Sequence, residues 1–168
     1  MSEDYQLSTP DLADKYGEKV CAIICPFISF GKIKVFNGIA VTVKCFEDNS
    51  KVKEVVHRAG HGKILVVDGG GSLERALLGD QLAKTAVENG WCGIVINGCV
   101  RDVEIIKDLS IGVLALGSVP FKTEKLEKGE IDVPISIGGQ QINPGMHLFC
   151  DENGILVFPK NVNLIPVD

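Results

Sequence analysis

The sequence predicts an α/β fold with a parallel β-α-β core, followed by a C-terminal part that is rich in β-structure. Two apolar segments, Lys63–Asp68 and Trp91–Asn97, are almost continuous, as expected of strands covered on both faces. A helical pattern follows each of them, and a third core strand is predicted over Gly112–Leu116. Strands and helices that alternate in this way form a parallel sheet with right-handed crossovers.

The chain before this core is predicted to add two helices and two strands. Ser8 is a helix cap followed by a proline and an acidic residue, which predicts a short helix that ends at about Tyr16. The segments Val20–Ile28 and Ile39–Cys45 are predicted strands. The segment Ser50–Ala59 is a predicted helix, closed by the glycines that follow it.

The remaining elements follow the same periodicities. After the glycine turn that follows the first core strand, a helical stretch is predicted to run to Asn89, with an interruption at Gly79. A second core helix is predicted over Val100–Leu109. The charged segment Lys122–Glu130 is expected to be a mobile connection. From Val133 onward, short β segments separated by glycine turns predict antiparallel β-structure packed on the first layer.

Composition excludes several classes of function. The 168 residues predict a single domain over 1–168 with a sizeable core, and the net charge of −5 argues against direct binding of nucleic acid. No apolar run approaches the roughly 20 residues of a membrane span. The N-terminus resembles neither a secretory signal nor a transit peptide, so a cytoplasmic protein is expected. Six cysteines without a Cys-x-x-Cys pair indicate reduced thiols in that compartment.

The glycine-rich segment Asp68–Ser72 permits two interpretations. It loosely resembles the acidic, glycine-rich turn of adenosylmethionine-dependent methyltransferases, but Glu74 stands where a dinucleotide-binding motif would place its third glycine. The simpler interpretation is a sharp turn after a buried strand, which brings the backbone close to a neighbour or a ligand. We favour the sharp turn.

Two corners of the predicted core carry candidate functional side chains. Gly79 breaks a helical pattern, so Asp80 is predicted to be the N-cap of a new helix that begins with Gln81 and Leu82. Its free backbone N–H groups would suit a carboxylate or a phosphate. After a gap of twenty residues, Arg101 and Asp102 occupy the equivalent place in the next β-α unit.

Each corner has a purely structural explanation. Asp80 would then only cap its helix, Asp102 would only be an acid in a first helical turn, and Arg101 would be a surface charge. However, ligands of open α/β sheets collect beyond the carboxyl ends of successive parallel strands. The three side chains are therefore expected to converge on a metal and a small anionic substrate.

The chain resembles the RraA-like family, whose members include regulator of ribonuclease activity A and the metal-dependent 4-hydroxy-4-methyl-2-oxoglutarate aldolases. The similarity extends from about Ser8 to Phe158, and the segments that carry it are 43–49, 66–72, 93–98 and 112–115. It implies a single RraA-like domain of the swivelling β/β/α type. It also implies a homotrimer or a higher ring, with sites at the subunit boundaries.

Aldolases of this family are similar in having Asp, twenty residues and then Arg-Asp, and here Asp80, Arg101 and Asp102 complete that pattern. The resemblance implies that the backbone of Gly79, Asp80, Gln81 and Leu82 receives the carboxylate of a keto-acid substrate. It implies that Arg101 contacts the keto oxygen and that Asp102 holds Mg²⁺ or Mn²⁺. Some longer members use an acidic group from a neighbouring subunit's C-terminal extension.

This pattern predicts a divalent-metal-dependent lyase that cleaves 4-hydroxy-4-methyl-2-oxoglutarate to pyruvate, with secondary oxaloacetate decarboxylation through a shared pyruvate enolate. Arg101 and a metal would stabilise the developing oxyanion, and Asp80 would orient a water that removes the C4 hydroxyl proton. The alternative is a non-catalytic regulator that binds a ribonuclease and slows RNA decay. A negatively charged surface would suit basic segments of such a partner.

Overall fold

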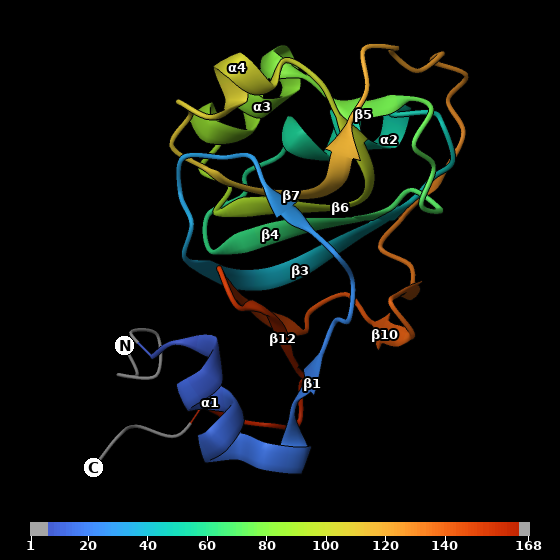
Figure 1. Cartoon of the computed structure of the whole chain (residues 1–168). Helices are drawn as coiled ribbons and strands as arrows, with labels where there is room; N and C mark the ends of the chain where they lie inside the picture. The colour runs from blue at the N-terminus through green and yellow to red at the C-terminus, as the bar shows by residue number, and fades with distance from the viewer. Residues whose placement is uncertain (1–6, 165–168) are drawn as a thin grey trace.

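The computed structural model describes residues 7–164 and contains one large mixed sheet, with strands in the order β1-β12-β11-β3-β4-β6-β7-β2. Helices α2, α3 and α4 lie on one side of this sheet, and α1 lies at the opposite end of the molecule (Figure 1). The predicted α/β class is confirmed. None of the helices in the described range is long and apolar enough to cross a membrane.

The parallel half of the sheet forms the predicted core. It consists of β3 (Phe36–Lys44), β4 (Lys63–Asp68), β6 (Gly93–Val100) and β7 (Gly112–Ser118), which pair in parallel. Apolar side chains on one face of these strands pack under α2 (Ser50–Val56), α3 (Asp80–Glu88) and α4 (Val103–Ile106). Burial on both faces explains the unbroken apolar run of β4.

The antiparallel half extends the same sheet on the other side of β3. It consists of β11 (His147–Asp151), β12 (Gly154–Phe158) and the edge strand β1 (Cys21–Ala22). Helix α1 (Thr9–Tyr16), capped by Ser8 as predicted, is followed by a short 3-10 turn, η2 (Gly17–Lys19). The tail does not simply pack on the first layer as predicted, because β11 hydrogen-bonds directly to β3.

Three short elements complete the structure. The hairpin of β9 (Ile135–Ile137) and β10 (Gln140–Ile142) contributes to the core on the face away from the helices. Strand β8 (Glu130–Ile131) pairs with the end of β3, and β2 (Ile28–Ser29) pairs with β7 at the far edge. The described cysteines are free thiols, as predicted, although only three of the six are buried.

Two predicted elements were wrong in type or extent because tertiary pairing overrides local pattern. The expected strand Val20–Ile28 is divided into β1 and β2, since Pro26 cannot donate a hydrogen bond to a ladder. The expected helical stretch before Gly79 instead contains the strand β5 (Ala76–Leu78). Its three side chains are buried, and its backbone pairs in parallel with the end of β6.

The core helices and the glycine turn also differ in detail from expectation. Helix α2 ends at Val56, three residues before the predicted end. Helix α4 covers only Val103–Ile106, because β6 continues beyond Asn97, through a register shift, to Val100. The turn after β4 is the sharp one favoured above: Gly70 and Gly71 have φ of +67° and +73°. Asp68 Oδ1 closes the turn by accepting a hydrogen bond from the Gly70 N–H at 3.0 Å.

Candidate active site

The two predicted corners lie side by side, at the ends of the paired strands β5 and β6. Leu78 is opposite Val100 in the ladder, and the Arg101 N–H donates to the Leu78 carbonyl at 2.9 Å. Beyond that pair, the Asp80 N–H donates to Asp102 Oδ2 at 3.1 Å. A hydrogen bond therefore joins residues 22 positions apart in the sequence and connects the start of α3 to the start of α4.

Gly79 is required by this close approach. A Cβ atom added to it would lie 2.7 Å from Asp102 Oδ2 and 3.5 Å from the Arg101 side chain. Its φ of −125° is open to any residue, so the constraint is contact rather than backbone conformation. Gly79 is also the N-cap of α3, which means that the predicted N-cap, Asp80, is instead the first residue of the helix. The prediction was one residue late because Gly79 supplies no capping side chain.

Asp102 adopts a left-handed backbone conformation, with φ of +56° and ψ of +39°. A non-glycine residue in this region is strained, and such strain is concentrated at functional sites. The Asp102 carbonyl accepts from the N–H groups of Ile105 and Ile106, so the residue is the N-cap of α4 rather than part of its first turn. Its side chain makes no capping bond within α4 and turns toward α3 instead.

The carboxylate of Asp80 pairs with Lys84 one turn later in α3, at 3.3 Å. Desolvation acts to raise the pKa of Asp80, but the hydrogen bond from Lys84, together with those from its other neighbours, holds that pKa below its usual value. Asp80 is therefore ionised at neutral pH.

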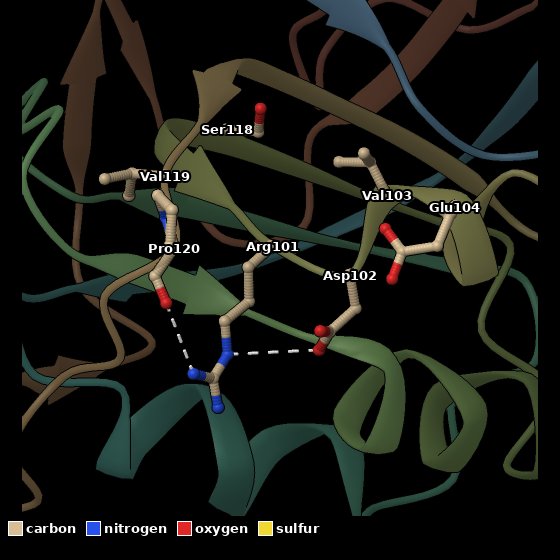
Figure 2. Close-up of a pocket in the computed structure, with 7 residues that line it drawn as sticks. All are labelled: Arg101, Asp102, Val103, Glu104, Ser118, Val119 and Pro120. Carbon is tan, nitrogen blue, oxygen red and sulfur yellow. Dashed lines mark hydrogen bonds and ion pairs between the residues drawn. The ribbon is translucent and has the colours of Figure 1, made fainter.

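The guanidinium of Arg101 is loosely held. Its Nε lies 3.9 Å from Asp102 Oδ2, and its Nη1 donates to the Pro120 carbonyl over 3.5 Å (Figure 2). The side chains of Arg101 and Asp102 are 39% and 32% exposed, so both can be reached from solvent. Nη2 has no partner among the described residues, which leaves a donor for a ligand oxygen.

All six predicted site residues line one cavity of about 200 Å³; they are Gly79, Asp80, Gln81, Leu82, Arg101 and Asp102. A second hollow of about 320 Å³ lies on the other side of Arg101 and Asp102, where Figure 2 shows Glu104 and Ser118 on its wall. The two hollows share only these two residues. Arg101 and Asp102 thus stand between two solvent-accessible spaces.

Sequence reasoning missed the basic part of the cavity wall. Lys53 from α2 and two lysines of the 119–129 segment, Lys122 and Lys125, line the same cavity with Asn49 and Thr123. With Arg101 they outnumber the two carboxylates, so the cavity carries excess positive charge. The run of charges in the segment Lys122–Glu130 was visible in the sequence, but nothing in it indicated contact with the site.

The donor set at Asp102 suits a hard divalent cation held by few protein atoms. Asp102 Oδ2 accepts the hydrogen bond from the Asp80 amide, and the Asp102 carboxyl group also interacts with the carboxyl group of Asp80. No group of three or more His, Cys, Asp or Glu side chains gathers in residues 7–164. A single accessible carboxylate fits Mg²⁺ or Mn²⁺, because Mg²⁺ prefers oxygen ligands and keeps several of its waters.

Comparison with known proteins places this site in a family. A family model described as RraA-like, Aldolase/RraA, matches residues 9–157. The chain belongs to the RraA-like family. A Shewanella oneidensis protein, provisionally named 4-hydroxy-4-methyl-2-oxoglutarate aldolase, is 53% identical over 154 residues, which cover 92% of this chain and 94% of that protein.

Two solved structures of family members are similar across almost their whole length. The RNA-processing inhibitor RraA from Thermus thermophilis has a TM-score of 0.90 and 44% identity, covering 94% of this chain and 95% of its own. A Geobacillus kaustophilus protein named as an S-adenosylmethionine: 2-dimethylmenaquinone methyltransferase has the same TM-score and 40% identity, covering 93% and 97%. The names of the three relatives describe different activities, so family membership alone does not assign one here.

Proposed function

We propose that this protein is a divalent-metal-dependent lyase that cleaves 4-hydroxy-4-methyl-2-oxoglutarate to pyruvate. The observation that carries the proposal is the convergence of Asp80, Arg101 and Asp102 on one basic cavity from two separate β-α corners. The provisional aldolase name of the Shewanella relative, at 53% identity, supports it. The sequence also predicts secondary oxaloacetate decarboxylation, since both reactions break the C3–C4 bond of a 2-keto acid.

The substrate's C1 carboxylate is proposed to bind at the start of α3. The first-turn amides of a helix have no intrahelical partners and carry partial positive charge. The Asp80 amide is already bonded to Asp102, so the amides of Gln81 and Leu82 are the proposed donors. The loose hydrogen bonding of Arg101 leaves it able to donate to the keto oxygen at C2.

Negative charge develops on the keto oxygen as the C3–C4 bond breaks, and Arg101 is placed to stabilise it. A divalent cation held by Asp102 would act as a Lewis acid on the same oxygen. Ionised Asp80 is proposed to orient a water that takes the proton from the C4 hydroxyl. The lysines of the cavity wall suit the second carboxylate of the substrate.

Pyruvate release tests the proposal. The purified protein is expected to release pyruvate from 4-hydroxy-4-methyl-2-oxoglutarate and from oxaloacetate with Mg²⁺ or Mn²⁺, and to lose both activities in EDTA. Turnover that does not depend on metal, or no turnover with either metal, would reject the lyase. The expected homotrimer or higher ring is tested separately by the molar mass in solution.

The second candidate function is a non-catalytic regulator that binds a ribonuclease. It is favoured by the likeness to the RNA-processing inhibitor of Thermus thermophilis and by the net charge of −5, which suits basic partner segments. Under this proposal the protein captures a ribonuclease and slows RNA cleavage, and the Asp102→Asn variant inhibits as well as the wild type. Direct binding of RNA is not expected at this charge.

A further inference from the structure

The connection between β7 and β8, residues 119–129, contains most of the segment Lys122–Glu130 that was expected to be mobile. Besides a backbone pairing of Phe121 and Lys122 with Ala76, side chains near the start of α2 fasten it at two points. At the first, Thr123 is buried, its hydroxyl donates to Asn49 Oδ1 at 2.8 Å, and it accepts from the Asn49 N–H at 3.3 Å. At the second, three consecutive backbone amides of residues 126–128 donate to side chains at the start of α2. Lys125 lies between the two points, and Lys122 directly precedes the first.

The second fastening point is centred on Asp48, which is 3% exposed. Its Oδ2 accepts from the amides of Leu126 at 2.8 Å and Lys128 at 3.3 Å. Its Oδ1 accepts from the hydroxyl and the amide of Ser50, and the Ser50 hydroxyl accepts from the Glu127 amide at 3.2 Å. We call Asp48 and Ser50 with the amides of residues 126–128 the Asp48 clasp.

The Asp48 clasp holds a strained backbone. Glu127 has a φ of +56°, a left-handed conformation that is unfavourable without compensating bonds. Burial acts to raise the pKa of Asp48, but hydrogen bonds from Ser50 and the two amides of the segment hold that pKa below its usual value. The carboxylate is therefore ionised, and charge-assisted hydrogen bonds of this kind are the stronger ones.

We propose that Asp48 is a positioning residue for substrate binding, which fixes the 119–129 segment so that Lys122 and Lys125 bind the second carboxylate of a dicarboxylic keto acid. The two lysines line the site cavity, and neither forms an ion pair within the described residues. Without the clasp, the segment loses its fastening after Thr123, and Lys125 samples positions away from the cavity, whereas the pairing of Phe121 and Lys122 with Ala76 still holds Lys122. This inference rests on the proposed function for its substrate, but not for its geometry.

The clasp has a matched control elsewhere in the molecule. Asp151 is also nearly buried, and its carboxylate accepts from the Thr9 amide, the Thr9 hydroxyl and the Asn153 amide at 2.7–2.8 Å. It fastens α1 to β11, far from the site in the chain and outside the cavity wall. Asp151→Asn therefore removes a comparable buried carboxylate without touching the 119–129 segment.

Steady-state kinetics of wild type, Asp48→Asn and Asp151→Asn with 4-hydroxy-4-methyl-2-oxoglutarate test the proposal. Asp48→Asn is expected to raise KM by about tenfold, the scale of one charge-assisted hydrogen bond, with kcat within about threefold. With the monocarboxylic analogue 4-hydroxy-2-oxopentanoate, its KM is expected to match the wild type. Asp151→Asn is expected to lower the melting temperature and leave both KM values unchanged. An unchanged KM in Asp48→Asn, or an equal rise in Asp151→Asn, overturns the proposal.

Two further measurements keep the test decisive. If Asp48→Asn does not fold, Ser50→Ala keeps the Asp48 carboxylate but removes the acceptor of the Glu127 amide and the hydroxyl donor to Asp48 Oδ1. This variant is expected to raise KM by about threefold, and an unchanged KM overturns the proposal. If the wild type shows no lyase activity, calorimetric binding of 2-oxoglutarate and 2-oxopentanoate replaces kinetics. A selective loss of 2-oxoglutarate affinity in Asp48→Asn and in Lys122→Gln/Lys125→Gln then supports the clasp although the lyase has failed, and equal affinities overturn it.

Discussion

In the antiparallel half of the sheet, aromatic side chains of β11 and β12 pack into a buried cluster. By contrast, the residues that follow β5 and β6 carry charged side chains that are partly exposed. Phe158 is 1% exposed, and its ring centroid lies 4.9 Å from that of Tyr16 and 5.1 Å from that of Phe149. Arg101 and Asp102 make only long contacts with each other and stay open to solvent. The comparison indicates that the aromatic region supplies stability, and it fits our proposal that the charged region supplies chemistry.

Backbone strain separates ordinary turns from positions where a side chain is used. Turns with positive φ in both halves use glycine, as at Gly70, Gly138 and Gly145, whereas four non-glycine residues among those described also have positive φ: Glu47, Asp102, Glu127 and Asp132. At the site, Asp102 itself holds the left-handed conformation, and in the Asp48 clasp Glu127 does so. Side chains are kept at strained positions where they are needed for contacts, and the predictions below separate these two kinds of region.

The largest effect on stability is expected from Phe158→Ala. Removing a fully buried aromatic ring from the Tyr16–Phe149–Phe158 cluster is expected to cost about 3–5 kcal/mol of unfolding free energy. KM and kcat of the folded variant are expected to stay within twofold of wild type, since Phe158 does not line the site cavity. Urea unfolding and steady-state kinetics check this, and a variant that stays folded but loses activity would break the comparison.

Arg101→Ala is expected to lower activity strongly and to leave stability almost unchanged. Loss of one donor to the developing oxyanion is expected to lower kcat/KM by about 100-fold or more. Because Arg101 is partly exposed and loosely bonded, the unfolding free energy is expected to change by less than about 0.5 kcal/mol. Arg101→Lys keeps the charge but loses the planar fork, so it is expected to remain impaired at saturating metal. Full activity in Arg101→Lys would show that charge alone suffices.

Asp102→Asn is expected to weaken the apparent affinity for Mn²⁺ by about tenfold or more, the scale seen when a supporting group of a metal site is lost. Excess Mn²⁺ is expected to restore part of the rate. Asparagine tolerates the left-handed conformation better than alanine does, so the start of α4 is expected to be kept. Titration of activity with Mn²⁺ and a thermal melt check this, and an unchanged metal dependence would remove Asp102 from the cation site.

A pH dependence of stability is also expected in the antiparallel half. Burial lowers the pKa of His147 to about 4. Between pH 6.5 and 4, the unfolded chain therefore binds a proton that the folded protein does not, so this contribution to stability falls as pH falls and levels off below pH 4. Unfolding free energies of wild type and His147→Gln across this range are expected to differ in slope. If the unfolding free energies of the two proteins change with pH in the same way, the lowered pKa of His147 is contradicted.

Much of the parallel half could be predicted from the sequence because its signals are local. The predicted strand Lys63–Asp68 matches β4 residue for residue, since its four central residues, Ile64–Val67, are apolar and buried on both faces. Strand β5 could not be predicted in this way. Its short apolar segment, Ala76–Leu78, fits helix and strand equally well, and only pairing with Cys99 and Val100 decides between them.

The candidate site divides along the same line. The two corners could be predicted because Gly79 breaks a helical pattern before Asp80, while Arg101 and Asp102 follow a core strand. All four residues line one cavity. The lysines that line this cavity could not be predicted, because Asp48 holds their segment through amides that lie 78 and 80 positions later in the chain. A clasp between distant segments leaves no periodicity that a sequence pattern can show.

The central claim is that the corner of Arg101 and Asp102 performs chemistry and does not merely cap a helix. The most direct measurement is pyruvate release from 4-hydroxy-4-methyl-2-oxoglutarate with Mn²⁺ by the wild type and by the folded double variant Arg101→Ala/Asp102→Asn. The wild type is expected to release pyruvate, and the double variant is expected to fall to the rate without protein while its melting temperature stays within a few degrees. Equal rates in the two proteins would contradict the claim.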